Sequence, residues 1–400
     1  MGKMYYICKE WPNKYKPTWD WQIRELHKAG YDITVIQTHK RCSSKKLIPN
    51  TDREVNYLWY PSTLRDVFNL RDLFNLFFSF RWLSFKRLKC LFVKTPFKNR
   101  VLYFVRSLYL PSQEPCSVFL KNLSTSHDFF FINKFYPHST LFMYYHGAAT
   151  AGVEPTYLET CGRAFKWLKV IFTNTQYSKG TLFDLGCEPE KIKVLPVGFD
   201  LEEFPEPDRQ YFKHERLNLL TVSRVSKEKG LIYVLMALRD LVAGGMDKIF
   251  LDVVGEGEEL NELREFVSEN NLEEYVVFHG YQPNTQVRRT FLPQADLLIN
   301  AAIPIGLCQE NQCIAVQEAN LLKVPALVTK IGGLPEVVFD GVNGYVVPHS
   351  DVDSICASIR AHASLTEFEA KAFGASSRKF VAEKFDVEKM TATILSTVTS

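Results

Sequence analysis

The chain has 400 residues, of which 46% are hydrophobic and 23% charged, and its formal net charge is +3. This length predicts two domains with separate cores. The small net charge gives no reason to expect a nucleic-acid partner. The nine cysteines include no CxxC pair, which excludes a disulfide scaffold and a cysteine-based zinc site.

The amino-terminal sequence lacks the uninterrupted apolar core of a signal peptide, and no window of 18 apolar residues occurs along the chain. Gly2 does not begin a myristoylation motif, because Tyr6 stands where that motif has Ser or Thr. These features predict a cytoplasmic location.

The amino-terminal half alternates apolar runs with a helical pattern. Residues 3–11 and 31–39 are typical of strands, and residues 18–30 predict a helix that ends at Gly30. Apolar runs that continue the series lie at 127–135, 140–147 and 169–175. Three prolines within 192–207 indicate a domain boundary. We therefore expect a first Rossmann-like domain over residues 1–198.

Residues 65–106 do not fit this alternation, because they mix aromatic side chains with ten basic and only two acidic residues. Basic amphipathic helices of this kind can lie on an anionic membrane surface. The other interpretation is a pair of helices whose Phe and Leu side chains face the domain core. The first interpretation predicts peripheral contact with the inner face of the plasma membrane.

From residue 217 onward, short apolar runs alternate regularly with helical patterns. Strands are expected at 217–225, 248–257, 275–281, 295–303 and 325–330, and helices at 231–245 and 258–271. Such alternation predicts a parallel sheet with helices on both faces, whose ligands bind at the carboxyl ends of the strands. The predicted fold class is α/β, with a second doubly wound domain over residues 199–380 facing the first across a cleft.

Two glutamates, Glu310 and Glu318, stand eight positions apart. Within one helix this step would separate them by about 12 Å along the axis and turn them by roughly 80°. The two acids of a glycosidase stand roughly 5 to 9.5 Å apart and act on one bond. The longer step favours an extended ligand held at two points. Arg224 and Lys229 follow a strand and begin a helix, where they could neutralise a diphosphate.

Five segments, in this order and spacing, resemble the retaining nucleotide-sugar glycosyltransferases of family four. They are TVSRVSKEKGLIYVLMAL, LDVVGEGEEL, VVFHGY, ENQCIAVQEANLLKVPALVTKIGGLPEVV and DGVNGYVVP. Two further segments show a fainter resemblance. The opening of members that build bacterial surface polysaccharides is similar to WPNKYKPTWDWQIRELHKAGYDITVI, and their interdomain segment is similar to KIKVLPVGFDLEEF. The resemblance implies the two-domain GT-B fold, with a carboxyl-terminal helix over 381–400 that packs on the amino-terminal domain.

The resemblance also implies roles for individual residues. Arg224 and Lys229 match the diphosphate-binding pair, Glu310 the acid that contacts the transferred sugar, and Glu318 the acid that contacts the ribose. His146 matches a histidine beside the sugar, although a lone histidine at a strand end can also be structural. The other positions expected at the donor are Gly255, Gly257, Gly280, Tyr281, Asn311, Gln312, Cys313, Gly332 and Gly333.

The chain departs from the family pattern at two places. Asn311 and Cys313 stand where members carry glycine, another small residue or proline, so the shape of the sugar pocket is expected to differ. The first loop has NKYKPTWDW in place of a glycine pair. Either Thr18 or the backbone around Pro17 is expected to take the place of that pair near the donor phosphates, with Trp19 and Trp21 on the acceptor side.

Asp351 and Asp353 form a DxD sequence that resembles a metal-binding signature of other glycosyltransferases. Their position directly before a helical pattern predicts an amino-terminal helix cap instead. We therefore expect neither a metal nor another cofactor.

Together these features predict a glycosyltransferase that moves a sugar from a nucleoside-diphosphate donor to a hydroxyl of a glycan or lipid-linked acceptor, with retention of configuration. The expected process is bacterial polysaccharide synthesis, as exopolysaccharide, capsule or O-antigen. Two other functions stay open: a nucleotide-sugar epimerase of the same fold, and a catalytically silent partner that binds nucleotide or glycan.

Overall fold

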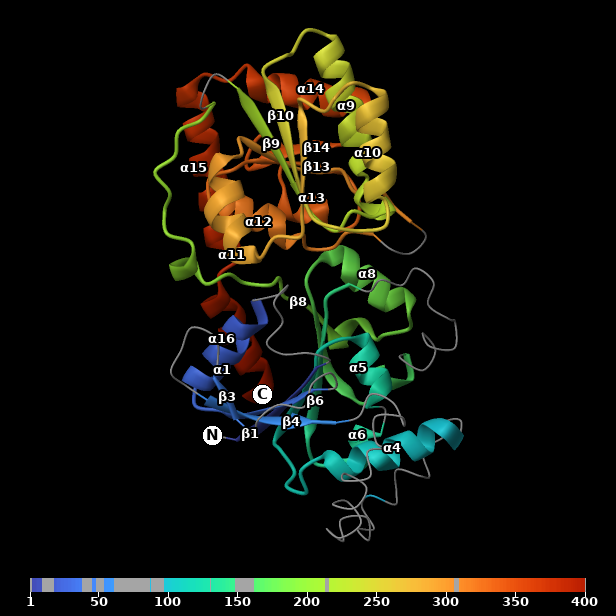
Figure 1. The fold of residues 1–400 in the computed structure, drawn as a ribbon. Helices are drawn as coiled ribbons and strands as arrows, with labels where there is room; N and C mark the ends of the chain where they lie inside the picture. The colour runs from blue at the N-terminus through green and yellow to red at the C-terminus, as the bar shows by residue number, and fades with distance from the viewer. Residues whose placement is uncertain are drawn as a thin grey trace.

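The computed structural model describes residues 2–8, 18–37, 45–47, 54–60, 87, 97–129, 131–147, 162–212, 216–305 and 309–399. These residues form two α/β domains, one below the other in Figure 1. The amino-terminal sheet and the carboxyl-terminal sheet are separate. This arrangement confirms the predicted fold class of two doubly wound domains.

The amino-terminal domain is built on an eight-stranded sheet with the order β3-β4-β2-β1-β5-β6-β7-β8. Only β3 runs antiparallel, against β4; the other pairs are parallel. The strands are β1 Lys3–Cys8, β2 Asp32–Gln37, β3 Lys45–Leu47, β4 Glu54–Trp59, β5 Ser117–Leu120, β6 Thr140–Tyr145, β7 Leu168–Thr173 and β8 Ile192–Val194. The central strands are buried almost throughout, as expected for a parallel sheet covered on both faces.

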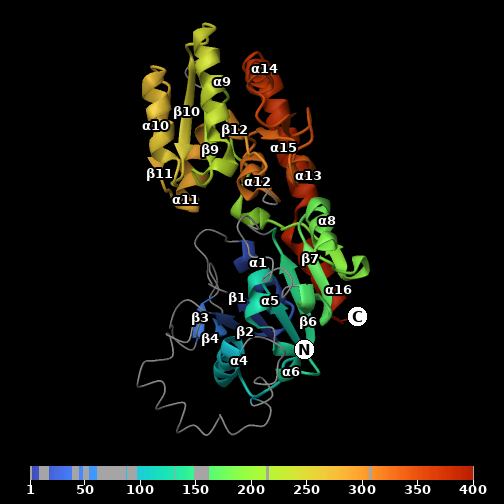
Figure 2. The same ribbon diagram turned by 90° about the vertical axis from the view of Figure 1, so that its right-hand side faces the viewer.

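The described helices of this domain lie on both sides of the sheet (Figure 2). They are α1 Thr18–Lys28, α4 Phe97–Tyr109, α5 Leu123–Asp128, α6 Ile132–Phe135 and α8 Gln176–Asp184. The prediction for 18–30 is confirmed, since Gly30 follows α1 with a positive φ of 89°. The run 127–135 belongs to α5 and α6 instead of a strand, and the strand of this unit is β5.

The carboxyl-terminal domain has a six-stranded, fully parallel sheet with the order β11-β10-β9-β12-β13-β14. Its strands are β9 Leu217–Val222, β10 Ile249–Val254, β11 Val276–Gly280, β12 Leu297–Asn300, β13 Ala326–Thr329 and β14 Gly344–Val347. Every residue of β12 and β13 is buried. The five strands predicted for this half are therefore confirmed as β9 to β13.

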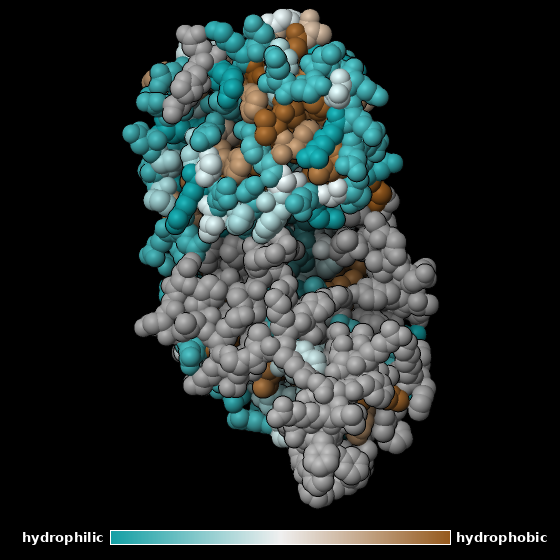
Figure 3. Space-filling view, viewed as in Figure 1, coloured by the Kyte–Doolittle hydropathy of each residue, from teal (hydrophilic) through white to brown (hydrophobic). Residues whose placement is uncertain are grey.

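Helices cover this sheet on both faces. They are α9 Leu231–Ala243, α10 Leu260–Glu269, α11 Asn284–Gln286, α12 Ile314–Leu321, α13 Leu334–Val337, α14 Val352–Ala363 and α15 Glu367–Lys384; the last helix of the chain, α16 Val387–Thr399, lies on the other domain. The Asp351 side chain accepts a hydrogen bond from the Ser354 amide, 3.0 Å away, at the start of α14. The predicted helix cap is thus confirmed. The face of this domain that Figure 3 shows is mostly hydrophilic, with apolar residues gathered in the region of β9 and β10.

The chain crosses between the two domains twice, and the two crossings touch. The Phe199 amide donates to the Phe385 carbonyl (2.7 Å), and the Val387 amide donates to the Phe199 carbonyl (3.1 Å). After the second crossing, α16 packs against α1 of the amino-terminal domain (Figure 1). Residues 387–399 therefore belong spatially to the first domain, and the linkage brings the carboxyl ends of both sheets toward each other.

The basic aromatic segment 65–106 lies outside the described residues except for Arg87 and residues 97–106. Arg87 is buried and donates to the Leu110 carbonyl (3.3 Å) and the Ser112 hydroxyl (3.2 Å). Arg106 is buried as well, 3.5 Å from the Asp128 carboxylate. These two arginines contact the domain interior and not a surface. Among the described residues, no helix combines the length and the apolar character needed to cross a bilayer.

Candidate donor-binding site between the domains

Three loops meet at the carboxyl ends of β9, β10 and β11. The Ser223 amide donates to the Val254 carbonyl (3.1 Å), and the Gly255 amide donates to the Gly280 carbonyl (2.9 Å). The β9 loop carries Arg224, the β10 loop carries Gly255 and Gly257, and the β11 loop begins with Gly280 and the exposed Tyr281. The structure thus brings these five predicted donor residues to one edge of the sheet.

Lys229 occupies the last position of a 3₁₀ turn, Lys227–Lys229, directly before α9. Gly230 follows in the left-handed region, with φ 61°, and a Cβ there would lie 2.0 Å from the Ala301 carbonyl oxygen. Only glycine tolerates both this conformation and this contact. The close approach holds Lys229 beside the end of β12.

The Lys229 ammonium forms an ion pair with Glu310. Both side chains are largely covered, with exposed fractions of 17% and 16%. Burial lowers the pKa of Lys229, but the Glu310 carboxylate opposes this effect, and the pKa is raised overall. Lys229 is therefore held in its charged form at the edge of the site.

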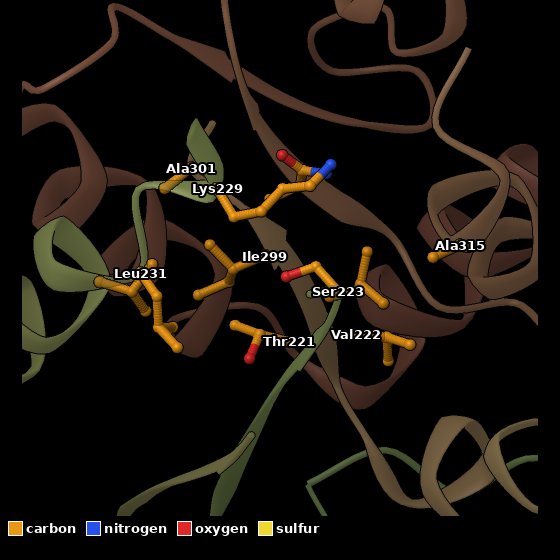
Figure 4. A pocket seen from close by; sticks show the side chains of 11 residues that line it. Thr221, Val222, Ser223, Lys229, Leu231, Ile299, Ala301 and Ala315 are labelled. Atoms are coloured by element: carbon orange, nitrogen blue, oxygen red, sulfur yellow. The ribbon is translucent and has the colours of Figure 1, made fainter. Parts of the chain in front are cut away.

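A small cavity of about 10 Å³ lies beside Lys229 and the end of β9. Figure 4 shows the Lys229 side chain extended on one side of it, with Ser223 and Thr221 on the other. A cavity of this volume has room for about one water molecule. This cavity is therefore too small to hold a nucleotide sugar.

Glu310 is positioned by the turn that contains Gly332 and Gly333. The Gly333 amide donates to the Glu310 carbonyl (2.9 Å), and the Gly332 amide donates to the Gln309 side chain (2.9 Å). Gly332 has a φ of 50°, and a Cβ there would lie 2.0 Å from the Glu310 carbonyl oxygen. The glycine turn thus packs directly on the backbone of the first acid.

Glu310 and Glu318 do not lie in one helix. Because α12 begins only at Ile314, the spacing of about 12 Å along a helix does not apply to them. Cys313 is the residue before α12, and its thiol accepts a hydrogen bond from Asn300 (3.1 Å). The first acid is in the loop that leads to the amino terminus of α12, and the second is inside the helix.

Glu318 is buried, with 4% of its surface exposed. The Arg288 guanidinium lies 2.7 Å from its Oε1 atom. Burial raises the pKa of Glu318, and the positive charge of Arg288 opposes this effect without cancelling it. Sequence reasoning missed Arg288, because no motif connects a residue after β11 with an acid in α12.

The amino-terminal domain contributes the loop after β6. His146 stacks on the Tyr144 ring, with centroids 4.4 Å apart and an interplanar angle of 9°. A Cβ on the next residue, Gly147, would lie 3.0 Å from Asn311 Nδ2. The His146 loop therefore faces the loop of the first acid. Thr18, Trp19 and Trp21 form the start of α1, and their side chains lie outside the described part of the structure.

Three polar side chains join the donor loop region to the amino-terminal domain. The Thr175 hydroxyl donates to Asn311 Oδ1. The Gln312 side chain accepts from the Val197 amide (2.7 Å) and donates to the Val197 carbonyl (2.9 Å). The Glu336 carboxylate accepts from the first two amides of α8, at 2.7 and 2.8 Å. Asn311 and Gln312 were predicted at the donor, and here their side chains contact the other domain.

Arg224 differs from Lys229 in its exposure. Its side chain is 70% exposed and forms an ion pair with Glu228 at 2.7 Å. Desolvation raises the pKa of Glu228, but hydrogen bonds and the charges of Arg224 and Lys229 lower it overall. The site thus offers one buried and one exposed cation beside a carboxylate. Such a combination can bind a diphosphate and hydrogen-bond neutral hydroxyls. Among the described residues, no group of three or more metal-ligating side chains occurs.

Comparison with known proteins assigns residues 204–379 to the model of the family described as "Glycosyl transferases group 1". The amylovoran biosynthesis glycosyltransferase AmsK of Erwinia amylovora is 28% identical over 177 residues, which cover 44% of this chain and 43% of that protein. A GDP-mannose-dependent phosphatidylinositol monomannoside mannosyltransferase of Mycolicibacterium smegmatis is 32% identical over 181 residues, covering 42% of this chain and 46% of that protein. The chain thus spans about half the length of the curated relatives it matches.

The fold is similar to that of Anabaena Alr3699/HepE, solved in complex with UDP-glucose. The TM-score is 0.71 and the two chains cover each other completely, at 15% sequence identity. This similarity confirms the GT-B arrangement of the two domains.

Proposed function

We propose that this chain, whose residues 204–379 match the model of the glycosyl transferases group 1 family, moves a sugar from a nucleoside-diphosphate donor to a hydroxyl of a glycan or lipid-linked acceptor. The observation that carries the proposal is the Lys229–Glu310 ion pair at the carboxyl end of the sheet, facing the other domain. This pair supports the proposal because a cation suited to a diphosphate lies beside a carboxylate that can accept hydrogen bonds from sugar hydroxyls.

The donor diphosphate would bind between Lys229, Arg224 and the amino terminus of α12. The first amides of a helix are suited to an anion because they have no partners within the helix. Lys229 would exchange its contact with Glu310 for a contact with phosphate. The freed Glu310 carboxylate then accepts a hydrogen bond from a hydroxyl of the transferred sugar. Glu318, deeper in the domain, would accept from the ribose.

During the reaction the bond between the anomeric carbon and the diphosphate oxygen breaks, and a bond to the acceptor oxygen forms. Negative charge develops on the departing diphosphate, and fixed cations stabilise that charge. We propose that the acceptor approaches from the face that the diphosphate leaves, so configuration is retained, and that its proton passes to a phosphate oxygen. His146, in the loop that faces Asn311, would contact the sugar from the amino-terminal domain.

Relatives of this chain support the proposed biological setting. AmsK acts in amylovoran biosynthesis, which supports a role in bacterial polysaccharide synthesis. Alr3699/HepE is bound to UDP-glucose, which makes UDP-sugars the first donors to test. We propose that the enzyme works at the cytoplasmic side of the membrane, where a lipid-linked acceptor would be presented. We propose that the reaction needs no metal, because Lys229 and Arg224 can stabilise the charge that develops on the diphosphate.

The test is a donor screen. Purified protein is incubated with a panel of UDP-, GDP- and dTDP-sugars, and thermal stabilisation and slow donor hydrolysis are recorded. A nucleotide sugar present at 100 times its Kd stabilises the folded state by about 2.7 kcal/mol, which is readily detected. If no member of the panel stabilises the protein, the proposal is wrong.

Glu310→Gln separates the proposed enzyme from the two other functions. A hydrogen bond to a charged group contributes about 1.5–3 kcal/mol, so we expect turnover to fall by about 10- to 150-fold while the protein still folds. Glu367→Gln, at an exposed glutamate of α15, is the matched control. An epimerase would convert the donor without any acceptor, and a silent binding partner would show no turnover in either form.

A further inference from the structure

Arg288 lies between two carboxylates that come from different parts of the chain. Its Nη2 atom is 2.7 Å from Glu318 Oε1, and its Nη1 atom is 3.2 Å from Glu203 Oε2. The guanidinium also stacks over the Phe204 ring, 4.5 Å from the centroid. With an exposed side-chain fraction of only 13%, Arg288 is held on three sides. Such a site restricts the guanidinium to one orientation.

The backbone around Arg288 is unusual. Residues Val287–Phe291 form a turn of π-helix directly after α11. π turns are rare, and they frequently occur at functional sites. This turn follows the β11 loop, where Gly280 and Tyr281 are placed. Arg288 therefore reaches Glu318 from the segment that follows this predicted donor loop.

Glu318 depends on Arg288 for a charged partner. The carboxylate is buried, and an ionised carboxylate in an apolar environment requires a cation or several hydrogen bonds. Arg288 contacts Oε1. Within the described part of the chain, no hydrogen bond to Oε2 is present. The second oxygen is therefore available to accept a hydrogen bond from a ligand.

Glu203 anchors the arginine from the opposite direction. It ends the 3₁₀ turn Leu201–Glu203, just after the chain crosses from the first domain into the second. The neighbouring Phe204 carbonyl accepts a hydrogen bond from Arg378 of α15 (2.7 Å), so this segment is fixed to the carboxyl-terminal domain. Arg288 cannot turn away from Glu318 without leaving Glu203 and the Phe204 ring.

We propose that Arg288 is a positioning residue for ribose recognition: it orients the Glu318 carboxylate so that Oε2 accepts a hydrogen bond from a ribose hydroxyl of the donor nucleotide. This inference rests on the proposed function, in which Glu318 contacts the ribose. It adds a residue outside the known sequence pattern of the site. It also explains why a largely covered arginine lies against this acid, since a ligand hydroxyl alone could not balance the negative charge of the carboxylate.

The test compares ribonucleotides with their 2′-deoxy forms. The dissociation constants of UDP, 2′-deoxy-UDP, GDP and 2′-deoxy-GDP are measured by calorimetry for the 400-residue protein. For whichever base binds, the wild-type protein should prefer the ribose form by about tenfold or more, as expected for a hydrogen bond to a charged group. In Arg288→Met this ratio should fall toward one, and in Arg288→Lys it should be intermediate.

Arg289→Met is the matched control, since Arg289 is the adjacent arginine, is exposed, and should leave the ratio unchanged. A merely structural arginine would weaken both nucleotides equally, so an unchanged ratio in Arg288→Met would overturn the inference. Glu318→Gln separates this failure from that of the proposed function. If Glu318→Gln also keeps the ratio, Glu318 is not the ribose acid. If Glu318→Gln abolishes the preference for the ribose form while Arg288→Met keeps it, Glu318 is the ribose acid and only the role of Arg288 is wrong.

Discussion

The contact between Glu336 and α8 leads to a prediction about how the two domains are held together. Glu336 belongs to α13 of the carboxyl-terminal domain, and its carboxylate accepts hydrogen bonds from the Gln176 and Tyr177 amides of the other domain. The third amide of α8, that of Ser178, donates to the Thr175 hydroxyl (3.1 Å). The amino terminus of α8 is thus capped partly by its own domain and partly by its neighbour.

Replacing Glu336 with alanine removes a charged acceptor from a helix amino terminus. Loss of a cap costs about 0.5–2 kcal/mol, and a favourable charge at that end contributes about 0.3–1 kcal/mol. Glu336 is only partly buried and Gln176 is exposed, so solvent screening keeps the sum near 1–2 kcal/mol. Because the contact joins two domains, this loss should favour their separation by a factor of about 5–30.

The assay is the distance between the domains in solution, measured by fluorescence transfer between one label in each domain or by the radius of gyration. Glu336→Ala should shift both toward a more open form, and donor binding should restore the closed form. Glu369→Ala is the control, because Glu369 caps α15 within a single domain and should lower the unfolding temperature only. If the two variants behave alike, with unchanged domain separation, the reasoning about Glu336 is refuted.

Two further predictions concern stability. Gly230→Ala should destabilise the protein by more than about 2 kcal/mol, because the new Cβ would lie 2.0 Å from the Ala301 carbonyl oxygen at a positive φ. Urea unfolding measures the change in the free energy of unfolding. A change below about 0.5 kcal/mol would contradict the predicted clash. Burial lowers the pKa of His362 to about 4, whereas the unfolded side chain titrates near pH ~6.5. Below that pH the unfolded chain binds a proton that the folded chain excludes, so stability should fall by up to about 3 kcal/mol between pH ~6.5 and 4. His362→Gln should remove this part of the pH dependence, and an unchanged profile would count against it.

The alternation of apolar runs and helical patterns was sufficient to predict the fold class and the carboxyl-terminal strands β9 to β13. Buried parallel strands have nearly continuous apolar runs, and those runs are legible in a single sequence. The Asp351 cap was predictable for a similar reason, since a cap depends only on residues within one helical turn. The run 127–135 was misread, because short apolar stretches suit a buried helix as well as a strand.

The site required the tertiary structure. The sequence alone indicated that Lys229 and Glu310 follow strands of one parallel sheet, and such ends meet at one edge. It could not show that these two residues, 81 positions apart, form an ion pair. Nor could it reveal Arg288 beside Glu318, Gln312 against Val197, or Glu336 at the start of α8. Local sequence patterns indicate which face of a helix or strand is buried. Polar contacts between distant segments depend instead on how the domains pack, and that packing produces no periodic pattern in the sequence.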